Sequence, residues 1–214
     1  MDRYTEPDFS AAVLITIDTQ RDTLDGQPLE IPGTSSILPN MSRILSAFRA
    51  LQRPIVHVVR LYKPDGSNVD LCRRAAVETG RLGALAPDTP GVQLAPRLLS
   101  DDRISLDCSM LLSGGVQALA AHEVIIYKPR WGAFYQTRLE SYLRGLDVTT
   151  AIFTGCNFPN CPRTSIMEAS ERDFRVVLVR DAVSGFGERD ETEMARIGVS
   201  VLSTDELLAR VSRV

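Results

Sequence analysis

The sequence has few cysteines, few histidines and no excess of one charge. Only 4 cysteines and 2 histidines occur among 214 residues. This is too few for the disulfide scaffold of a small secreted protein, and no CxxC or paired His/Cys cluster indicates structural zinc. The 24 basic residues face 27 acidic ones, for a net charge of -3. No run of Lys or Arg suggests binding to nucleic acid or to a membrane surface.

Long apolar runs are also missing. No stretch approaches the roughly 20 residues that span a bilayer, and the first residues lack the basic-then-apolar design of a signal peptide. A cytoplasmic protein with reduced thiols and a small-molecule partner is therefore expected. The length and the 44% hydrophobic content suit one buried core, which predicts a single domain over residues 1–214.

What the chain does contain is an alternation of apolar, β-branched runs with longer amphipathic segments, which is typical of βαβ units. The expected strands are residues 12–17, 54–59, 123–127, 150–154, 175–179 and 199–202. Five of these runs are nearly all apolar, as strands covered on both faces should be. The expected helices are residues 38–51, 113–120, 137–146, 163–173, 191–197 and 204–211.

This pattern predicts an α/β fold with three layers and a doubly wound sheet. The exception is the stretch of residues 63–107, rich in Gly and Pro, with a weak helical piece at residues 71–79. A connection this long in a compact domain is usually functional or shared with a partner subunit.

Three polar residues follow expected strands, at the sheet edge where ligands bind in such folds. Asp18 follows the first strand, Lys128 the third, and the loop after the fourth ends at Cys161. Cys161 also stands where a helix is expected to begin, with Pro162 favouring the first helical position. A helix N-terminus favours thiolate over thiol, so the pKa of Cys161 is expected to be lowered.

If these residues meet, their chemistry is coherent. Asp18 accepts the thiol proton, Lys128 stabilises both anions, and Cys161 attacks a carbonyl-like carbon. Backbone N–H groups near the helix start would hold the oxyanion. Taken singly, each residue also has a structural interpretation: Cys161 as a small buried hydrophobe, Asp18 as a turn cap, and Lys128 as a solvated lysine.

Residues near this edge are candidates for further contacts. Gln20, Trp131 and Phe134 are expected to bind substrate, although both aromatic residues also suit a core or interface. Asp22 either acts at the site or only secures its loop. Cys156 is expected to pack or line the turn, with a redox role as the alternative.

The motifs Asp18-x-Gln20, Lys128-x-Arg130-x-Gly132-Ala133-Phe134 and Gly155 followed by Cys161 stand in this order along the chain. Together they resemble the isochorismatase-like cysteine hydrolases, which include nicotinamidases, carbamoylsarcosine amidohydrolases and ureidoacrylate amidohydrolases. The resemblance covers nearly the whole chain. It implies a Rossmann-like α/β/α fold with a six-stranded, mainly parallel sheet and hydrolysis of C–N bonds through a thioester.

The resemblance also implies site residues. The triad would be Asp18, Lys128 and Cys161, with the N–H groups of Asn157 and Cys161 as the oxyanion hole and a cis peptide preceding Asn157. It further implies a homo-oligomer, a dimer or tetramer, with the stretch of residues 63–107 as the expected contributor to the interface.

Departures from the family pattern narrow the function. Nicotinamidases carry a metal-binding Asp-x-His after the second strand, whereas this chain reads Arg60-Leu61-Tyr62 there. No metal or cofactor is therefore expected, and nicotinamide is a poor substrate candidate. A retained cysteine favours amide chemistry over the vinyl-ether cleavage of true isochorismatases.

The sequence thus predicts a metal-independent cysteine hydrolase acting on a small amide, ureido or carbamoyl compound. The alternatives are an isochorismatase-type vinyl-ether hydrolase and a catalytically lapsed family member that acts as a binding subunit. Substrate identity stays open, as does the question of whether Arg130 or Arg163 pairs with a substrate carboxylate or with protein groups.

Overall fold

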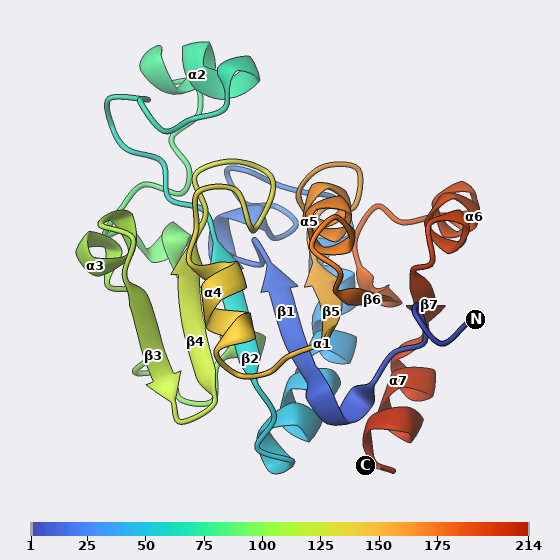
Figure 1. Cartoon of the computed structure of the whole chain (residues 1–214). Helices are drawn as coiled ribbons and strands as arrows, with labels where there is room; N and C mark the ends of the chain where they lie inside the picture. Colours follow the sequence, from blue (N-terminus) through green and yellow to red (C-terminus); the bar gives the residue numbers. More distant parts are fainter. Residues whose placement is uncertain (1, 214) are drawn as a thin grey trace.

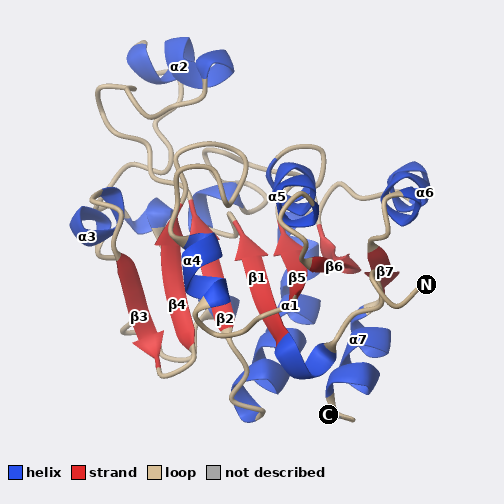
Figure 2. Ribbon diagram, in the orientation of Figure 1, coloured by secondary structure: helices blue, strands red, loops and turns tan. Residues whose placement is uncertain are grey.

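A seven-stranded sheet runs through the centre of the computed structural model, which describes residues 2–213 (Figures 1 and 2). Its spatial order is β3-β4-β2-β1-β5-β6-β7. The strands are β1 (Ala12–Ile17), β2 (Ile55–Val59), β3 (Val116–Ala120), β4 (Glu123–Tyr127), β5 (Thr150–Gly155), β6 (Arg175–Val183) and β7 (Ser200–Leu202). All neighbouring pairs are parallel except β3 with β4. The predicted α/β doubly wound class is confirmed.

The additional strand is β3, so the expected count of six was short by one, and the helix expected over residues 113–120 is wrong. Gly114 and Gly115 precede the strand, and residues from Val116 onward pair antiparallel with β4. The Gln-Ala-Leu-Ala composition favours a helix, but pairing with an open strand edge outweighs that weak local preference. The resulting edge strand is only partly buried.

Helices cover both faces of the sheet (Figure 2). On one face, α1 (Thr34–Ala50) and α7 (Thr204–Val211) pack on alternate side chains of the central strands, such as Leu14 and Ile152. On the other face lie α4 (Leu139–Arg144), α5 (Cys161–Ser170) and α6 (Glu188–Arg196), which pack on the intervening side chains, such as Ile15 and Phe153. The central strand β1 is buried along its whole length, as its continuous apolar run predicts.

The stretch between β2 and β3 carries α2 (Leu71–Glu78) and α3 (Cys108–Leu112). Short 3-10 turns occur at Phe9–Ala11, Arg21–Thr23, Pro90–Val92 and Pro96–Leu98. The helical piece expected at residues 71–79 is confirmed as α2, which has no buried residue and stands clear of the sheet, beyond the carboxyl ends of its strands (Figure 1). Within residues 2–213, no helix is long and apolar enough to cross a bilayer.

The order of the strands reverses between β1 and β5, because the chain proceeds from β1 through β2 and β4 to one side and from β5 through β6 and β7 to the other. The crevice at such a switch point is where open α/β sheets bind ligands. The two strand ends approach closely there, since the Cys156 N–H donates to the Ile17 carbonyl at 2.9 Å. A Cβ on Gly155, which has φ +110°, would lie 2.2 Å from that same oxygen, so only glycine fits.

Candidate active site

Asp18 and Lys128 form a buried ion pair at the carboxyl edge of the sheet. Lys128 Nζ lies 2.8 Å from Asp18 Oδ2, and the lysine is fully buried. Their backbones are fixed by β2, because the Asp18 N–H donates to the Val58 carbonyl at 2.9 Å and the Lys128 N–H donates to the Val59 carbonyl at 3.0 Å. The predicted convergence of an acid and a base is thus observed, and the lysine is not a solvated one.

Cys161 begins α5 beside this pair. A small cavity is lined by Asp18, Cys156, Asn157 and Cys161, together with Thr23, Leu29, Ile31, Arg60, Tyr62, Arg73 and Leu85. Asp18 Oδ1 is buried and accepts no hydrogen bond within residues 2–213, whereas Oδ2 is paired with Lys128. Asp18 Oδ1 can therefore accept a proton from a group in this cavity.

The pKa of the Cys161 thiol is raised to about 12. Burial is the main cause and the charge of Asp18 adds to it, while Lys128 lowers the pKa by less. The expectation that the helix N-terminus would lower this pKa is wrong, because desolvation of the buried sulfur outweighs it. Near neutral pH the group is a thiol, and it needs a base before it can act as a nucleophile.

The loop that precedes Cys161 presents backbone N–H groups to the same cavity. The peptide bond between Cys156 and Asn157 is cis, as expected from the sequence. Among the backbone hydrogen bonds of residues 2–213, none has the N–H of Asn157 or Cys161 as donor. Two unpaired N–H groups near a thiol are the arrangement that an oxyanion requires.

Side chains of α5 hold the loop that follows β4. Ser165 Oγ accepts a hydrogen bond from the Ala133 N–H at 3.0 Å and donates to the Cys161 carbonyl at 2.7 Å. One turn later, Glu168 accepts from the Phe134 N–H at 2.8 Å. These bonds join the element that starts with the thiol to the loop that starts with Lys128.

Cys156 lies under the site. Its thiol is buried and donates to the Asp18 carbonyl at 3.1 Å. Burial raises the pKa of this thiol, and the charge of Asp18 raises it further. The expectation that Cys156 packs in the turn is confirmed, and its sulfur holds the Asp18 backbone, which has the left-handed φ of +48°.

Gln20 and Asp22 connect the loop after β1 to the insertion between β2 and β3. The Gln20 amide donates to the Arg60 and Val92 carbonyls, at 2.9 and 2.6 Å, and accepts from the Arg60 N–H at 2.8 Å. Asp22 accepts from the Leu85 N–H at 2.6 Å and does not line the cavity, so of its two expected roles the structure shows the one that secures the loop. Gln20 is fully buried and does not line the cavity.

The two aromatic candidates lie outside the cavity lining. Phe134 is buried in the core, with its ring centroid 5.8 Å from that of Phe174. Trp131 lines a separate hollow with Asp70, Arg130, Gly132, Tyr135, Thr164 and Glu168. Both aromatic residues follow Lys128 in sequence and pack on the core cluster that includes Cys161, but neither lines the cavity beside the thiol.

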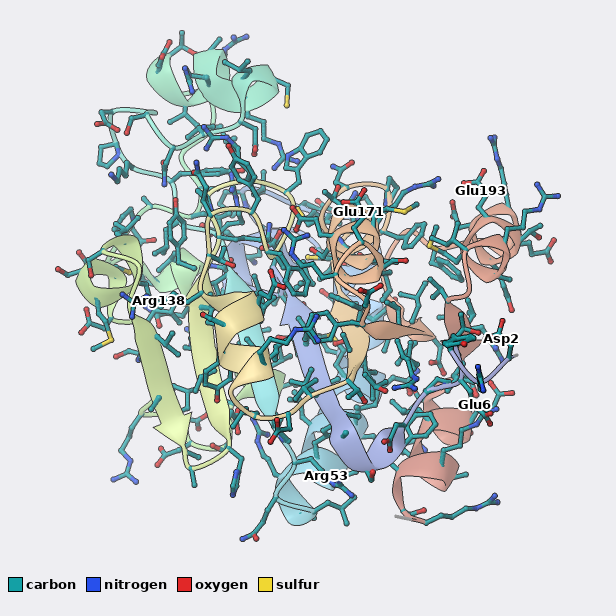
Figure 3. The ribbon with its side chains drawn as sticks, viewed as in Figure 1. Asp2, Glu6, Arg53, Arg138, Glu171 and Glu193 are labelled. Carbon is teal, nitrogen blue, oxygen red and sulfur yellow. The ribbon has the colours of Figure 1, made fainter. Side chains whose placement is uncertain are left out.

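Arg130 and Arg163 are engaged within the protein. Arg130 donates to the carbonyls of Asn68 and Pro129. Arg163 pairs with Glu193, which projects from α6 (Figure 3), and with Asp190. The structure therefore uses both arginines to hold segments together.

Two other arginines line the cavity, and the sequence reasoning did not select them. Arg60 follows β2 and is nearly fully buried, whereas Arg73 comes from α2. Arg60 was noted only as a departure from a metal-binding motif. Its position directly after a buried strand was the available signal, but nothing in the sequence indicated that α2 would bring Arg73 to the same place.

No group of three His, Cys, Asp or Glu side chains in the described part of the chain is arranged to hold a metal ion. His57 is fully buried between Thr16 and Glu123, at 2.8 Å from each, and Glu123 also pairs with Arg49 at 2.6 Å. This network joins the sheet to α1, outside the lining of the cavity.

Comparison with known proteins places this arrangement in context. Residues 112–206 match the model of the isochorismatase domain. Over 199 residues the chain is 27% identical to a "probable inactive nicotinamidase" of Arabidopsis thaliana, covering 90% of this chain and 92% of that protein. It is 30% identical over 165 residues to the N-carbamoylsarcosine amidase of an Arthrobacter species, covering 75% of this chain and 54% of that enzyme.

A solved structure shows the same relationship along almost the full length. The isochorismatase family protein from Desulfovibrio vulgaris superposes with a TM-score of 0.79 at 28% sequence identity. The match covers 95% of this chain and 99% of that one. The fold and the sequence similarity therefore agree.

Proposed function

Since this chain belongs to the isochorismatase-like family, we propose that it is a cysteine hydrolase that cleaves a C–N bond of a small amide, ureido or carbamoyl compound. The observation that carries the proposal is the buried Asp18–Lys128 pair in contact with the cavity that holds Cys161. The N-carbamoylsarcosine amidase among the relatives supports the substrate class.

In the first step, the proton of the Cys161 thiol passes to the free Oδ1 of Asp18 as the sulfur attacks the carbonyl carbon. The raised pKa of the thiol makes this coupling necessary, because almost no thiolate exists beforehand. Lys128, whose Nζ lies 2.8 Å from Oδ2, holds the Asp18 side chain in place during the transfer. The new C–S bond produces a tetrahedral oxyanion, which accepts hydrogen bonds from the Asn157 and Cys161 N–H groups.

In the second step, the C–N bond breaks. The proton held by Asp18 moves to the departing nitrogen, and an acyl thioester on Cys161 is left. Water then attacks the thioester carbon while Asp18 takes one of its protons. As the C–S bond breaks, Asp18 returns that proton to the sulfur and the thiol is restored. The products are an amine or ammonia and a carboxylic or carbamic acid.

We propose that the reaction uses no metal cofactor. In this chain the residues after β2 are Arg60, Leu61 and Tyr62, which supply neither a carboxylate nor an imidazole. Arg60 instead carries a positive charge to this position and pairs with Asp70 at 2.8 Å.

We also propose that the protein forms a homo-oligomer. Leu71 on the projecting helix α2 is 82% exposed, and Tyr135, beside the hollow that Trp131 lines, is 47% exposed. A second copy of the chain that covered these side chains would remove their apolar surface from water, which favours association. Light scattering measures the mass directly, and a monomer at micromolar concentration would contradict this part.

A panel of small amides, ureido acids and carbamoyl compounds tests the reaction, with release of ammonia or amine as the readout. Wild-type protein is expected to turn over at least one class, and Cys161→Ala to lose more than about 1,000-fold of that rate. Cys72→Ala is the matched control, since Cys72 is exposed. Release of pyruvate from a vinyl ether, with no amide turned over, would instead support isochorismatase-type chemistry. Absence of turnover across the panel would support a binding role.

A further inference from the structure

The cavity beside Cys161 contains two guanidinium groups that the reaction described above does not use. Arg60 is fixed from several sides: it pairs with Asp70, donates to the Lys128 carbonyl at 3.2 Å, and lies 5.0 Å from the centroid of the Tyr62 ring. Arg73 reaches the same tyrosine from α2 and donates to its hydroxyl at 3.0 Å. Tyr62 thus stands between the two arginines and separates their charges.

The charges around this cavity do not cancel. Lys128 is neutralised by Asp18, and Arg60 by Asp70. Among the ion pairs within residues 2–213, none includes Arg73. Because the Cys161 thiol is neutral, one positive charge is left over, that of Arg73, which lines the same cavity as Cys161.

An arginine with one of its five N–H groups engaged has several donors left for a planar anion. A carboxylate fits this fork, and the mostly buried side chains that line the cavity strengthen the attraction relative to water. Arg73 and Cys161 line the same small cavity, so an anion bound by Arg73 and a carbonyl attacked by Cys161 can belong to one small molecule.

We propose that Arg73 binds the carboxylate of an anionic amide substrate, and that Arg60 and Tyr62 position it. This inference rests on the proposed hydrolase function and names its substrate class: small amides or ureido compounds with one negative charge. Arg73 is then a specificity-determining residue that the insertion between β2 and β3 contributes.

Alkylation of Cys161 tests the anion site without requiring turnover. Iodoacetate and iodoacetamide both form a C–S bond and release iodide, but only iodoacetate carries a carboxylate. The rate of each at Cys161 is measured at pH 8 by peptide mass spectrometry in a Cys72→Ser background, and the ratio of the two rates is compared with that of free cysteine. The variants are Arg73→Gln, Arg73→Lys and, as a matched control from the same segment, the exposed Arg81→Gln.

The expected ratio of iodoacetate to iodoacetamide rates is about tenfold above that of free cysteine, as for a pairing worth one order of magnitude in affinity. It should fall to within about twofold of free cysteine in Arg73→Gln, stay intermediate in Arg73→Lys and be unchanged in Arg81→Gln. The ratio of the two rates cancels any effect of Arg73 on the reactivity of the thiol itself, and an unchanged melting temperature of Arg73→Gln shows that the protein is still folded.

Equal ratios in wild-type protein and Arg73→Gln would overturn the inference, whatever the turnover panel shows. If neutral amides are hydrolysed and iodoacetate is not preferred, the hydrolase proposal stands and the anion site fails. If iodoacetate is preferred through Arg73 and no amide is hydrolysed, the anion site stands and the hydrolase proposal fails.

Discussion

Replacing Lys128 with methionine should destabilise the protein far more than any surface change, because it leaves the Asp18 carboxylate buried without its partner. The lysine side chain has no exposed surface and that of Asp18 is 6% exposed. Breaking such a buried pair typically costs about 3–5 kcal/mol. Lys128 Nζ also donates to the Arg130 carbonyl at 3.1 Å, and loss of that bond adds about 1 kcal/mol.

Urea unfolding measures this cost, with the fluorescence of the single tryptophan, Trp131, as the signal. The free energy of unfolding should fall by about 4 kcal/mol, a large part of the 5–15 kcal/mol that is usual for a domain. Lys63→Met is the matched control, since Lys63 is the only other lysine and forms none of the ion pairs in the described part of the chain.

A double variant separates the charge from the packing. Asp18→Asn combined with Lys128→Met leaves no unpaired charge, so it should recover about 2 kcal/mol relative to Lys128→Met alone. A single variant within about 1 kcal/mol of wild type, or a double variant that loses the sum of both single losses, would refute this account of the pair.

Two further predictions concern the sheet and its switch point. Burial raises the pKa of Glu123, but hydrogen bonds from Arg49 and His57 outweigh burial and lower this pKa to about 2. Since the folded pKa lies below the unfolded one of about 4.5, this carboxylate should contribute about 3 kcal/mol above pH 4.5 and lose it as the pH falls toward 2. Urea unfolding between pH 6 and pH 3 should therefore show a weaker acid loss in Glu123→Gln, and equal losses in both proteins would exclude the network as the cause. Gly155→Ala should lower stability by about 3 kcal/mol and abolish turnover, because its Cβ would meet the Ile17 carbonyl oxygen. Gly80→Ala shares a positive φ but meets nothing within 4 Å, so its loss should be about 1 kcal/mol, and similar melting temperatures for the two variants would contradict the contact argument.

The central strands were predicted correctly because their burial is uniform. The strands at Ala12–Ile17 and Thr150–Gly155 are buried at every position, and an unbroken apolar run is what such strands require. The strand at Val116–Ala120 was missed because it is a half-buried edge whose residues have no strand preference of their own. Its structure depends on pairing with β4, and local sequence contains little information about that.

The residues of the candidate site were likewise predicted only in part. Asp18, Lys128 and Cys161 each follow a strand or begin a helix, so the topology of the fold alone brings them to one edge. Arg73 arrives through an irregular insertion, whose course depends on contacts such as Asp22 with the Leu85 N–H. The thiol pKa was misjudged for a related reason, because burial of the sulfur is a property of the packed cavity.

The central claim is that Cys161 carries the acyl group during hydrolysis. Rapid acid quenching during turnover of an amide substrate, followed by intact-mass and peptide analysis, tests it directly. The account predicts a mass increase equal to the acyl part of the substrate on the peptide that contains Cys161, and no such adduct in Cys161→Ala. Steady product formation by Cys161→Ala at a rate near that of wild type, with no adduct on Cys161 in wild type, would contradict it.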